Sequence, residues 1–349
     1  MSVSACILSV SGPKLLPEEF LFLREAQPWG VILMGRSCQS RAQVRALTAE
    51  IMEALGREAL IFIDQEGGRV ARLKPPVWEK FPPAALYGQI YKQDAEIGVQ
   101  ACTLGHHLMG HELSQLRIRA DCAPCCDLRQ TTTHDAIGDR AFGYDPETVI
   151  QLSSAALAGL QQAGVLGCIK HMPGQGRATA DSHYDLPRIA ATATELQADF
   201  SIFKAVAQAA PMGMTGHVIM DAIDPDFPAT ISKKIIEEII RGRIGFDGLL
   251  MTDDLGMDAL GGSLQQRGRR AREAGCDVLL HCSGFLKDPA AILNEMRDVA
   301  DAAGALDGLS LQRADRVMTQ LEAPRAVAID DLQTEYAELI APYQSRAGV

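Results

Sequence analysis

Short apolar runs recur along this chain, and most of them end in a polar or reactive residue. They are Ala5–Val10, Val31–Met34, Leu60–Asp64, Ile118–Asp127, Leu166–His171, Met212–His217, Gly248–Asp253 and Asp277–Cys282. Segments of helical periodicity lie between several of them, such as Val44, Leu47, Ile51 and Leu55, which Gly56 ends. Strands that alternate with helices pair in parallel. The pattern predicts an α/β fold, an eight-stranded (β/α)8 barrel of the TIM type, with a doubly wound open sheet as the competing fold.

The polar residues that end the runs would meet in such a barrel. A β/α barrel carries its active site at the carboxyl ends of its strands. These ends hold Asp64, Asp127, Lys170-His171, His217, Asp253 and His281-Cys282. We therefore expect their side chains to converge on one mouth.

Length and composition favour one catalytic domain over residues 1–349, with a helical tail at about 310–349. The 349 residues fit one barrel with modest insertions, since about 250 residues are typical of the fold. No apolar stretch is long enough to cross a bilayer, and no basic region precedes the first apolar run, so we expect a cytoplasmic protein. The net charge of −11 disfavours nucleic acid or an anionic membrane as a partner. We expect a monomer, although no motif addresses assembly.

Two histidine and cysteine clusters offer weak metal signals. His106, His107, His111 and Glu112 include an i,i+4 histidine pair, but the glutamate is not placed as in His-Glu-x-x-His. An exposed or locally bonded helix face is the favoured interpretation. Cys122, Cys125 and Cys126 resemble half of a zinc site, without a second pair at suitable spacing. We interpret the nine cysteines as small buried hydrophobes of a reducing compartment and predict no metal site.

Two clusters of titratable residues flank a Gly/Pro stretch near the middle of the chain. They are Lys170-His171-Met172-Pro173-Gly174-Gln175-Gly176 and Asp181-Ser182-His183-Tyr184-Asp185-Leu186-Pro187. Gly and Pro cannot continue a strand or helix, so the second cluster should lie on a loop. Because paired charges are rarely buried without purpose, the layout predicts a site that closes on its ligand.

These residues belong to an ordered set of motifs. The set comprises Asp64-Gln65-Glu66-Gly67-Gly68-Arg69-Val70, Lys170-His171 with the following Pro-Gly, Asp181-Ser182-His183, and Thr252-Asp253-Asp254-Leu255-Gly256-Met257. In this order it resembles the motifs of the family 3 glycoside hydrolases, and within them the single-domain β-N-acetylglucosaminidases. The likeness runs from about Val31 to Cys282. Departures lie at Met172 and Gln175, where the family usually has Phe and His, and at Arg177 and Ala178, so loop motion and preference for the leaving group stay open.

The resemblance implies the roles of individual residues. It places the nucleophile at Asp253 and the acid/base at His183, with Asp181 as the partner of that histidine. The implied substrate-binding residues are Asp64, Arg72, Arg140, Lys170, His171 and His217. No metal or organic cofactor is implied.

Elementary chemistry supports the catalytic assignments. Retaining glycosyl transfer needs a carboxylate under the anomeric carbon and a proton donor beside the leaving oxygen. Asp253 ends an apolar run, whereas Asp254 points elsewhere if the strand continues, and should anchor the adjacent loop. A histidine such as His183 has an unperturbed pKa of about 6.5, which suits proton transfer near neutrality. Asp181 could fix its tautomer, or could make only an Asx-type turn bond.

The predicted function is a cytoplasmic retaining β-N-acetylglucosaminidase. It resembles the enzymes that remove N-acetylglucosamine from 1,6-anhydro-N-acetylmuramyl peptides during peptidoglycan recycling, so its partner would be a small sugar or muropeptide. The alternatives are a β-N-acetylglucosaminide phosphorylase on the same fold and a non-catalytic sugar-binding barrel.

Overall fold

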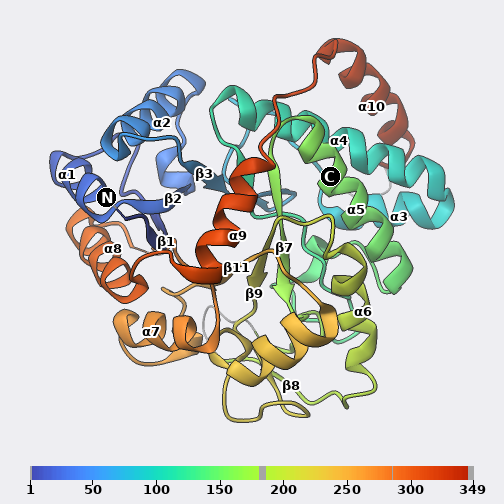
Figure 1. The fold of residues 1–349 in the computed structure, drawn as a ribbon. Coiled ribbons are helices and arrows are strands. Elements are labelled where there is room, and N and C mark those ends of the chain that lie inside the picture. The colour runs from blue at the N-terminus through green and yellow to red at the C-terminus, as the bar shows by residue number, and fades with distance from the viewer. Residues whose placement is uncertain (1, 181–185, 285, 345–349) are drawn as a thin grey trace.

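A computed structural model describes residues 2–180, 186–284 and 286–344, and eight parallel strands close into a barrel within it (Figure 1). Around the barrel they are β1 (Ser4–Ser9), β2 (Pro28–Leu33), β3 (Leu60–Ile63), β6 (Ala120–Asp121), β7 (Leu166–Met172), β9 (Met212–Thr215), β11 (Leu249–Asp254) and β12 (Val278–His281). The strand β12 pairs back with β1, Cys6 opposite Leu279. Every predicted strand is present, and the fold is the predicted barrel, not an open sheet.

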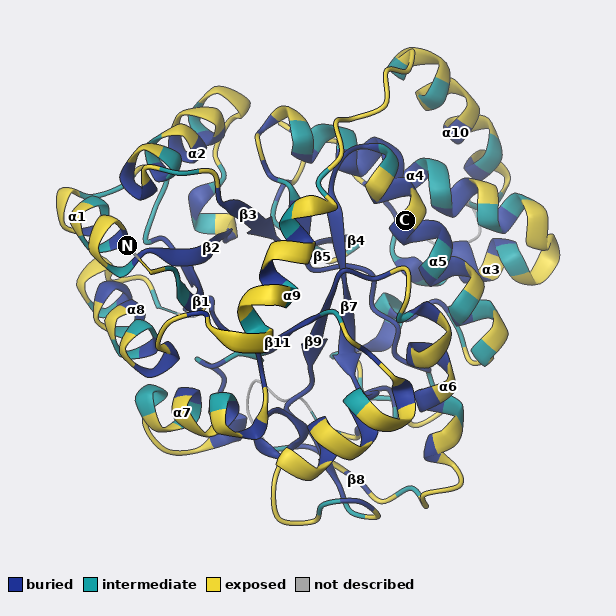
Figure 2. Cartoon of the chain, viewed as in Figure 1, coloured by how far each residue is buried: buried dark blue, intermediate teal, exposed yellow. Residues whose placement is uncertain are grey.

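Helices surround the barrel, with buried faces toward the strands and exposed faces outward (Figure 2). They are α1 (Pro17–Ala26), α2 (Arg41–Leu55), α3 (Ala84–Gln93), α4 (Ala95–Gln115), α5 (Pro146–Gln162), α6 (Leu196–Val206), the π-helix η4 (Ile235–Ile244), α7 (Leu264–Ala274), α8 (Pro289–Ala303), α9 (Gly308–Thr319) and α10 (Ile329–Gln344). Helix α2 matches its predicted periodicity and ends at Gly56, which adopts the left-handed conformation at φ 63°.

Short elements follow several strands at the carboxyl end of the barrel. They are η1 (Gly35–Ser37), the hairpin of β4 (Gln65–Gly67) and β5 (Val70–Ala71), η2 (Gly138–Arg140), the parallel pair β8 (Arg188–Ile189) and β10 (Ile219–Met220), η3 (Ala229–Ile231) and η5 (Asp258–Leu260). These elements and their loops carry the residues of the candidate site.

The strand β6 is much shorter than its predicted span of Ile118–Asp127. Pro124 interrupts the ladder, because proline has no amide hydrogen to donate to a neighbouring strand. The chain nevertheless stays alongside β7: the amide of Cys126 donates to the carbonyl of Lys170 at 2.7 Å. The short strand therefore still delivers Asp127 to the mouth of the barrel.

The helix α9 covers the amino ends of the strands, opposite the mouth (Figure 1). Arg313 donates to Asp277, which immediately precedes β12, at 3.1 Å, and also to Asp247, two residues before β11, at 2.9 Å. The region of the predicted helical tail thus contains α9 and α10. Helix α10 packs on α4, and the hydroxyl groups of Tyr336 and Tyr87 lie 2.7 Å apart.

The flagged cysteines and histidines lie mostly inside the protein. All nine cysteines are free; Cys38 is half-buried and the others are buried. His106 is buried in α4, and its Nδ1 lies 2.8 Å from the carbonyl oxygen of Cys102. Of the two interpretations of this cluster, an exposed or a locally bonded helix face, His106 therefore fits the second. His107 is also buried, so this helix face is not exposed. Among the described helices, none has the length and apolar composition required to cross a membrane.

Candidate active site

The carboxyl ends of the strands and their loops surround a cavity of about 340 Å³. Most of the predicted site residues line it: Asp64, Arg72, Arg140, Lys170, His171 and Asp253. His217 does not line the cavity and lies behind Asp253 and Asp254, as described below. Asp181 and His183 lie outside the described residues.

Opposite charges alternate around the cavity. Arg72 Nη2 donates to Asp64 Oδ2 at 2.7 Å, and Lys170 Nζ donates to Asp64 Oδ1 at 3.0 Å. The same ammonium group lies 2.6 Å from Glu66 Oε1. Arg140 donates two bonds of 2.8 Å to the carboxylate of Glu66, the bidentate geometry that suits a guanidinium. Each cation is therefore held by at least one carboxylate.

The chain of contacts continues from Arg140 to a buried histidine–carboxylate pair. Arg140 Nη2 lies 3.3 Å from His171 Nε2, and His171 Nδ1 lies 2.6 Å from Asp127 Oδ2. The other carboxylate oxygen of Asp127 accepts from the amide of Gln175 at 2.6 Å, and the Cys125 thiol donates to Oδ2 at 3.3 Å. Asp127 thereby fixes both the orientation of His171 and the start of the following loop. We name Arg72, Asp64, Lys170, Glu66, Arg140, His171 and Asp127 the mouth network.

Mutual pairing keeps the buried carboxylates of the mouth network ionised. Burial would raise the pKa of Glu66, but Arg140 and Lys170 lower it to about 2. Burial likewise opposes ionisation of Asp64, yet Lys170 and Arg72 hold its pKa well below the ordinary range. A buried charge is tolerable only when such partners compensate for its lost hydration. The guanidinium and ammonium groups are thus pre-oriented donors at the wall of the cavity.

The sequence assigned no role to Glu66, and it placed Asp127 at the mouth of the barrel without assigning it a partner. Gly67-Gly68 after Glu66 indicates a tight turn, and a turn does lie there, between β4 and β5; nothing in the sequence showed that this hairpin presents the Glu66 carboxylate to two cations. Gly67 is required there: its φ is 85°, and an added Cβ would lie 2.3 Å from the carbonyl oxygen of Pro82. Asp127 was visible as a strand-end aspartate, but nothing in the sequence paired it with His171.

Asp253 and Asp254 end β11 and differ in their surroundings. The amide of Asp254 donates to Asp253 Oδ1 at 2.8 Å. The Asp254 carboxylate accepts from the amides of Gly256 and Cys282 at 3.0 and 2.9 Å, which is the loop anchor expected from side-chain alternation. Burial would raise the pKa of Asp253, but the surrounding groups outweigh it and lower that pKa; they include His217 and His171. Asp253 is therefore a carboxylate at neutral pH.

His217 is fully buried, and protein groups engage both of its ring nitrogens. Its Nδ1 lies 2.7 Å from Thr230 Oγ1 and its Nε2 lies 3.0 Å from the carbonyl oxygen of Asp254. Thr215 Oγ1 lies 2.8 Å from the same hydroxyl of Thr230. Thr230 belongs to no motif of the sequence, and only the fold brings it to the histidine.

The departures from the family pattern lie at the base of the loop that precedes residue 181. Met172 is fully buried in β7. Arg177 Nε donates to Asp199 Oδ2 at 2.6 Å, and its Nη2 donates to the carbonyl of Glu195 at 3.0 Å. These bonds fasten the loop base to the start of α6.

The described residues contain one close group of metal-ligand types: atoms of Cys125, Asp127 and His171 lie within 4.8 Å of one another. Burial and the charge of Asp127 raise the pKa of the Cys125 thiol well above its ordinary value. The thiol therefore stays protonated and donates a hydrogen bond to Asp127. His171 Nδ1 is bonded to the same carboxylate. This donor set forms a closed hydrogen-bond network and does not resemble an open metal site.

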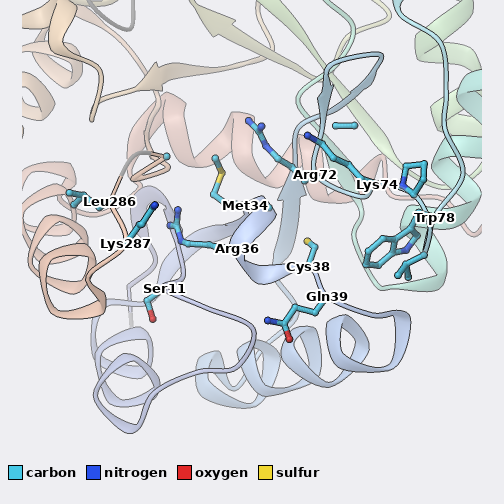
Figure 3. A pocket seen from close by; sticks show the side chains of 15 residues that line it. Ser11, Met34, Arg36, Cys38, Gln39, Arg72, Lys74, Trp78, Leu286 and Lys287 are labelled. Atoms are coloured by element: carbon cyan, nitrogen blue, oxygen red, sulfur yellow. The ribbon is translucent and has the colours of Figure 1, made fainter. Parts of the chain in front are cut away.

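A second cavity has a volume of about 630 Å³ (Figure 3). It adjoins the first and shares Met34, Arg72 and Gly284 with it. Arg36, Lys74 and Lys287 add further positive charges to its lining, and none of the described lining residues is acidic. In a chain of net charge −11, such a concentration of cations is a local departure from the overall charge. The two cavities together can hold a sugar and an attached anionic group.

Residues 17–319 match the model of the "Glycosyl hydrolase family 3 N terminal domain". The chain belongs to glycosyl hydrolase family 3. This family 3 member is 38% identical over 308 residues to a protein named beta-hexosaminidase from Alkalilimnicola ehrlichii, with 86% of each chain covered. It is 36% identical over 320 residues to a beta-hexosaminidase from Tolumonas auensis, covering 90% of this chain and 89% of the relative.

Solved family 3 structures share its fold over most of the chain. NagZ from Neisseria gonorrhoeae in complex with N-trifluoroacetyl-D-glucosamine superposes with a TM-score of 0.81 at 29% identity, covering 97% of this chain and 98% of NagZ. A family 3 β-N-acetylglucosaminidase from Paenibacillus sp. gives a TM-score of 0.82 at 28% identity, covering 96% of this chain and 67% of that protein. The predicted family and enzyme class, a glycoside hydrolase that resembles the β-N-acetylglucosaminidases, are confirmed.

Proposed function

We propose that this family 3 enzyme is a retaining exo-β-N-acetylglucosaminidase, which releases terminal β-linked N-acetylglucosamine through a covalent glycosyl-enzyme. One observation carries the proposal: an ionised carboxylate, Asp253, lines the same small cavity as the pre-oriented donors Arg140 and Lys170. The volume of about 340 Å³ suits a single small ligand. The names of the relatives, beta-hexosaminidase and β-N-acetylglucosaminidase, support the sugar.

In the proposed reaction Asp253 attacks the anomeric carbon while His183 protonates the leaving oxygen. Asp181 orients the histidine, which then removes a proton from the water that hydrolyses the glycosyl-enzyme. The assignments of His183 and Asp181 come from the Asp-Ser-His motif. Lys170, Arg72 and Arg140 would donate to sugar hydroxyls, and Asp64 would accept from them.

His171 has a more limited proposed role at the sugar. Its Nδ1 is bonded to Asp127. A sugar could therefore reach only its Nε2, which lies beside Arg140. We therefore assign His171 to the wall of the sugar site, where it also helps to lower the pKa of Asp253. His217, with both nitrogens bonded to protein groups, supports Asp253 from behind.

We further propose that the natural leaving group carries carboxylates, as a 1,6-anhydro-N-acetylmuramyl peptide does, and that the reaction serves peptidoglycan recycling in the cytoplasm. The support is the second cavity, whose cations Arg36, Lys74 and Lys287 lie beside the sugar site without an acidic neighbour in the described lining. Carboxylates are the natural counter-charges for such donors. The pathway and compartment rest on the family resemblance.

A phosphorylase is the second candidate, because the same cations could bind phosphate and a histidine repels an incoming phosphate less than a carboxylate does. A hydrolase should release free N-acetylglucosamine even in high phosphate. Chromatography that finds mainly the sugar 1-phosphate would establish the phosphorylase instead.

The deciding experiment compares chromogenic β-N-acetylglucosaminide with the matching β-glucoside, and then traps the enzyme with a 5-fluoro N-acetylglucosaminyl donor. We expect turnover of the first substrate and a covalent label on the peptide that holds Asp253, and neither in Asp253→Asn. A label on Asp64 or Asp254 would refute the assignment of the nucleophile. Binding of N-acetylglucosamine without turnover of either glycoside would instead indicate a sugar-binding barrel.

A further inference from the structure

The bond between His217 and the backbone after Asp253 determines where one ring proton lies. His217 Nε2 is 3.0 Å from the carbonyl oxygen of Asp254. A carbonyl oxygen can only accept, so this contact is a hydrogen bond only if Nε2 carries the proton. The alternative would place two lone pairs against each other in a fully buried site, which costs free energy.

The other ring nitrogen must then accept. Burial lowers the pKa of His217, although the charge of Asp253 opposes that shift, so the neutral ring predominates at neutral pH. A neutral imidazole has one N–H, which leaves Nδ1 as an acceptor. The group beside it is the hydroxyl of Thr230, at 2.7 Å, and that hydroxyl must donate.

The hydroxyl of Thr215 is consistent with donation from Thr230 to His217. Thr215 Oγ1 lies 2.8 Å from Thr230 Oγ1 and can donate to it, so Thr230 accepts one bond while it donates another. Thr230 Oγ1 also lies 3.2 Å from the carbonyl of Gly216, a longer contact than the one to His217. Donation to Gly216 would require a proton on Nδ1, and the neutral ring would then lose its bond to Asp254.

We propose that Thr230 is a positioning residue for the reaction: its hydroxyl holds His217 in the Nε2–H tautomer, and His217 in turn holds the backbone that fixes Asp253. The proposal deepens the proposed function and rests on it for the role of Asp253. Neither Thr230 nor His217 would touch the reacting atoms through this arrangement.

The route from Thr230 to Asp253 passes through one residue. The carbonyl of Asp254 accepts from His217, and the amide of Asp254 donates to Asp253 Oδ1 at 2.8 Å. The Asp254 carboxylate is separately fixed by the amides of Gly256 and Cys282. The Asp254 carbonyl also accepts from the amide of Met257 at 3.2 Å, so a change of tautomer at His217 would remove the shorter of its two bonds and loosen the backbone that follows Asp253.

The test removes the Thr230 hydroxyl without changing the volume of the side chain. Thr230→Val should lower kcat by about 10–100-fold with little change in KM, less than the ~10⁴-fold loss known when a histidine that itself transfers protons has the wrong tautomer. Thr230→Ser, which keeps a hydroxyl, should retain most of the wild-type kcat. The full-length enzyme and an aryl β-N-acetylglucosaminide serve for all variants.

Thr48→Val provides the matched control. Thr48 is equally buried, and its hydroxyl donates to the carbonyls of Arg45 and Leu116, both at 3.1 Å, away from the residues that line the cavity. Both valine variants should lose comparable stability in urea. A kcat for Thr230→Val no lower than that for Thr48→Val would overturn the proposal.

Nitrogen NMR of enzyme labelled at histidine adds a readout that packing alone would not move. The His217 signals, assigned by their loss in His217→Gln, should show protonated Nε2 and bare Nδ1 in the wild type and in Thr230→Ser, and an altered pattern in Thr230→Val. Protonated Nδ1 in the wild type would refute the proposal. These spectra need no substrate, so they stay informative if the glycoside and label experiments refute the proposed function itself.

Discussion

At the scale of single residues, the mouth network gives each buried charge its counter-charge inside the protein. Lys170 is shared by Asp64 and Glu66, and Arg140 is shared by Glu66 and His171. The donors are therefore oriented before a ligand arrives, and binding spends little free energy on arranging them. The same sharing means that removal of Lys170, Glu66 or Arg140 disturbs two partners at once.

Glu66→Gln tests this sharing through stability. At neutral pH the substitution should reduce the free energy of unfolding by about 3–5 kcal/mol, because Lys170 and Arg140 stay buried with less compensation. The pKa of Glu66 is about 2 in the folded protein, below its ordinary unfolded value, so its stabilisation is complete above about pH 4.5 and is lost as pH falls toward 2. Urea denaturation should therefore show the two proteins converging over that range. Exposed Glu238→Gln is the control, and a gap that persists at pH 2 would contradict the account.

His183→Ala tests the proposed acid/base through the leaving group. General acid catalysis contributes roughly 10²–10⁴-fold and matters most for poor leaving groups. The variant should lose most of its activity on a natural disaccharide but form the glycosyl-enzyme readily from an activated aryl glycoside, giving a burst of phenol. Asp181→Ala should show a milder form of the same pattern. Rapid-quench measurement of equal losses on both substrates, without a burst, would mean that the proton donor is another group.

The predicted convergence of side chains on one mouth is observed for residues that a motif or a strand end marked in the sequence. Asp64, Lys170 and Asp253 each end an apolar run, and the structure brings them to one cavity. Thr230 could not be found in this way, because it lies 13 residues from His217 and neither a motif nor the end of an apolar run marks it. Its significance depends on a three-dimensional contact and not on local chemistry.

At the scale of elements, the apolar runs predicted every barrel strand because a strand buried on both faces needs a continuous apolar sequence. The predicted length of β6 was wrong, since the apolar run continues through Pro124 whereas the regular strand ends at Asp121. Pairing of helices was not predictable from periodicity. The close approach of α4 and α5 depends on glycines whose spacing gives no signal of its own.

Gly159→Ala tests whether the close packing of α4 and α5 depends on this glycine. A Cβ at Gly159 would lie 2.3 Å from the carbonyl oxygen of Thr103 and 2.9 Å from the amide nitrogen of His107, so α5 would have to move away from α4. The overpacking should reduce the free energy of unfolding by about 1–3 kcal/mol, despite the better helix propensity of alanine. Gly12→Ala, with no atom within 4 Å of the added Cβ, should have little effect in the same urea titration. Unchanged stability in Gly159→Ala would show that the helices separate freely.

At the scale of the whole molecule, the net charge of −11 contrasts with the cations around the second cavity. Long-range repulsion of an anionic substrate would be screened over about 8–10 Å at moderate salt, whereas contacts inside a cavity are screened less. The local cations should therefore decide how a carboxylated leaving group binds. The overall charge should govern only its approach.

Paired substrates can separate these effects. Lys74→Gln and Lys287→Gln should each lower kcat/KM several-fold for a β-N-acetylglucosaminide whose aryl leaving group bears a carboxylate, because each removes a charge from the lining. A neutral aryl glycoside with the same leaving-group pKa should be hydrolysed as before. Lys204→Gln, on the exposed face of α6, is the control. An unchanged ratio between the two substrates in both variants would exclude an anionic partner for this cavity.

The bidentate pairing of Arg140 with Glu66 has a consequence for how the sequence can evolve. A guanidinium that forms two bonds of 2.8 Å to one buried carboxylate cannot lose that carboxylate and keep its place. Inherited changes at these two positions should therefore occur together or not at all, even though 74 residues separate them. Across descendants of this chain, positions 66 and 140 should covary more strongly than either does with its neighbours along the sequence.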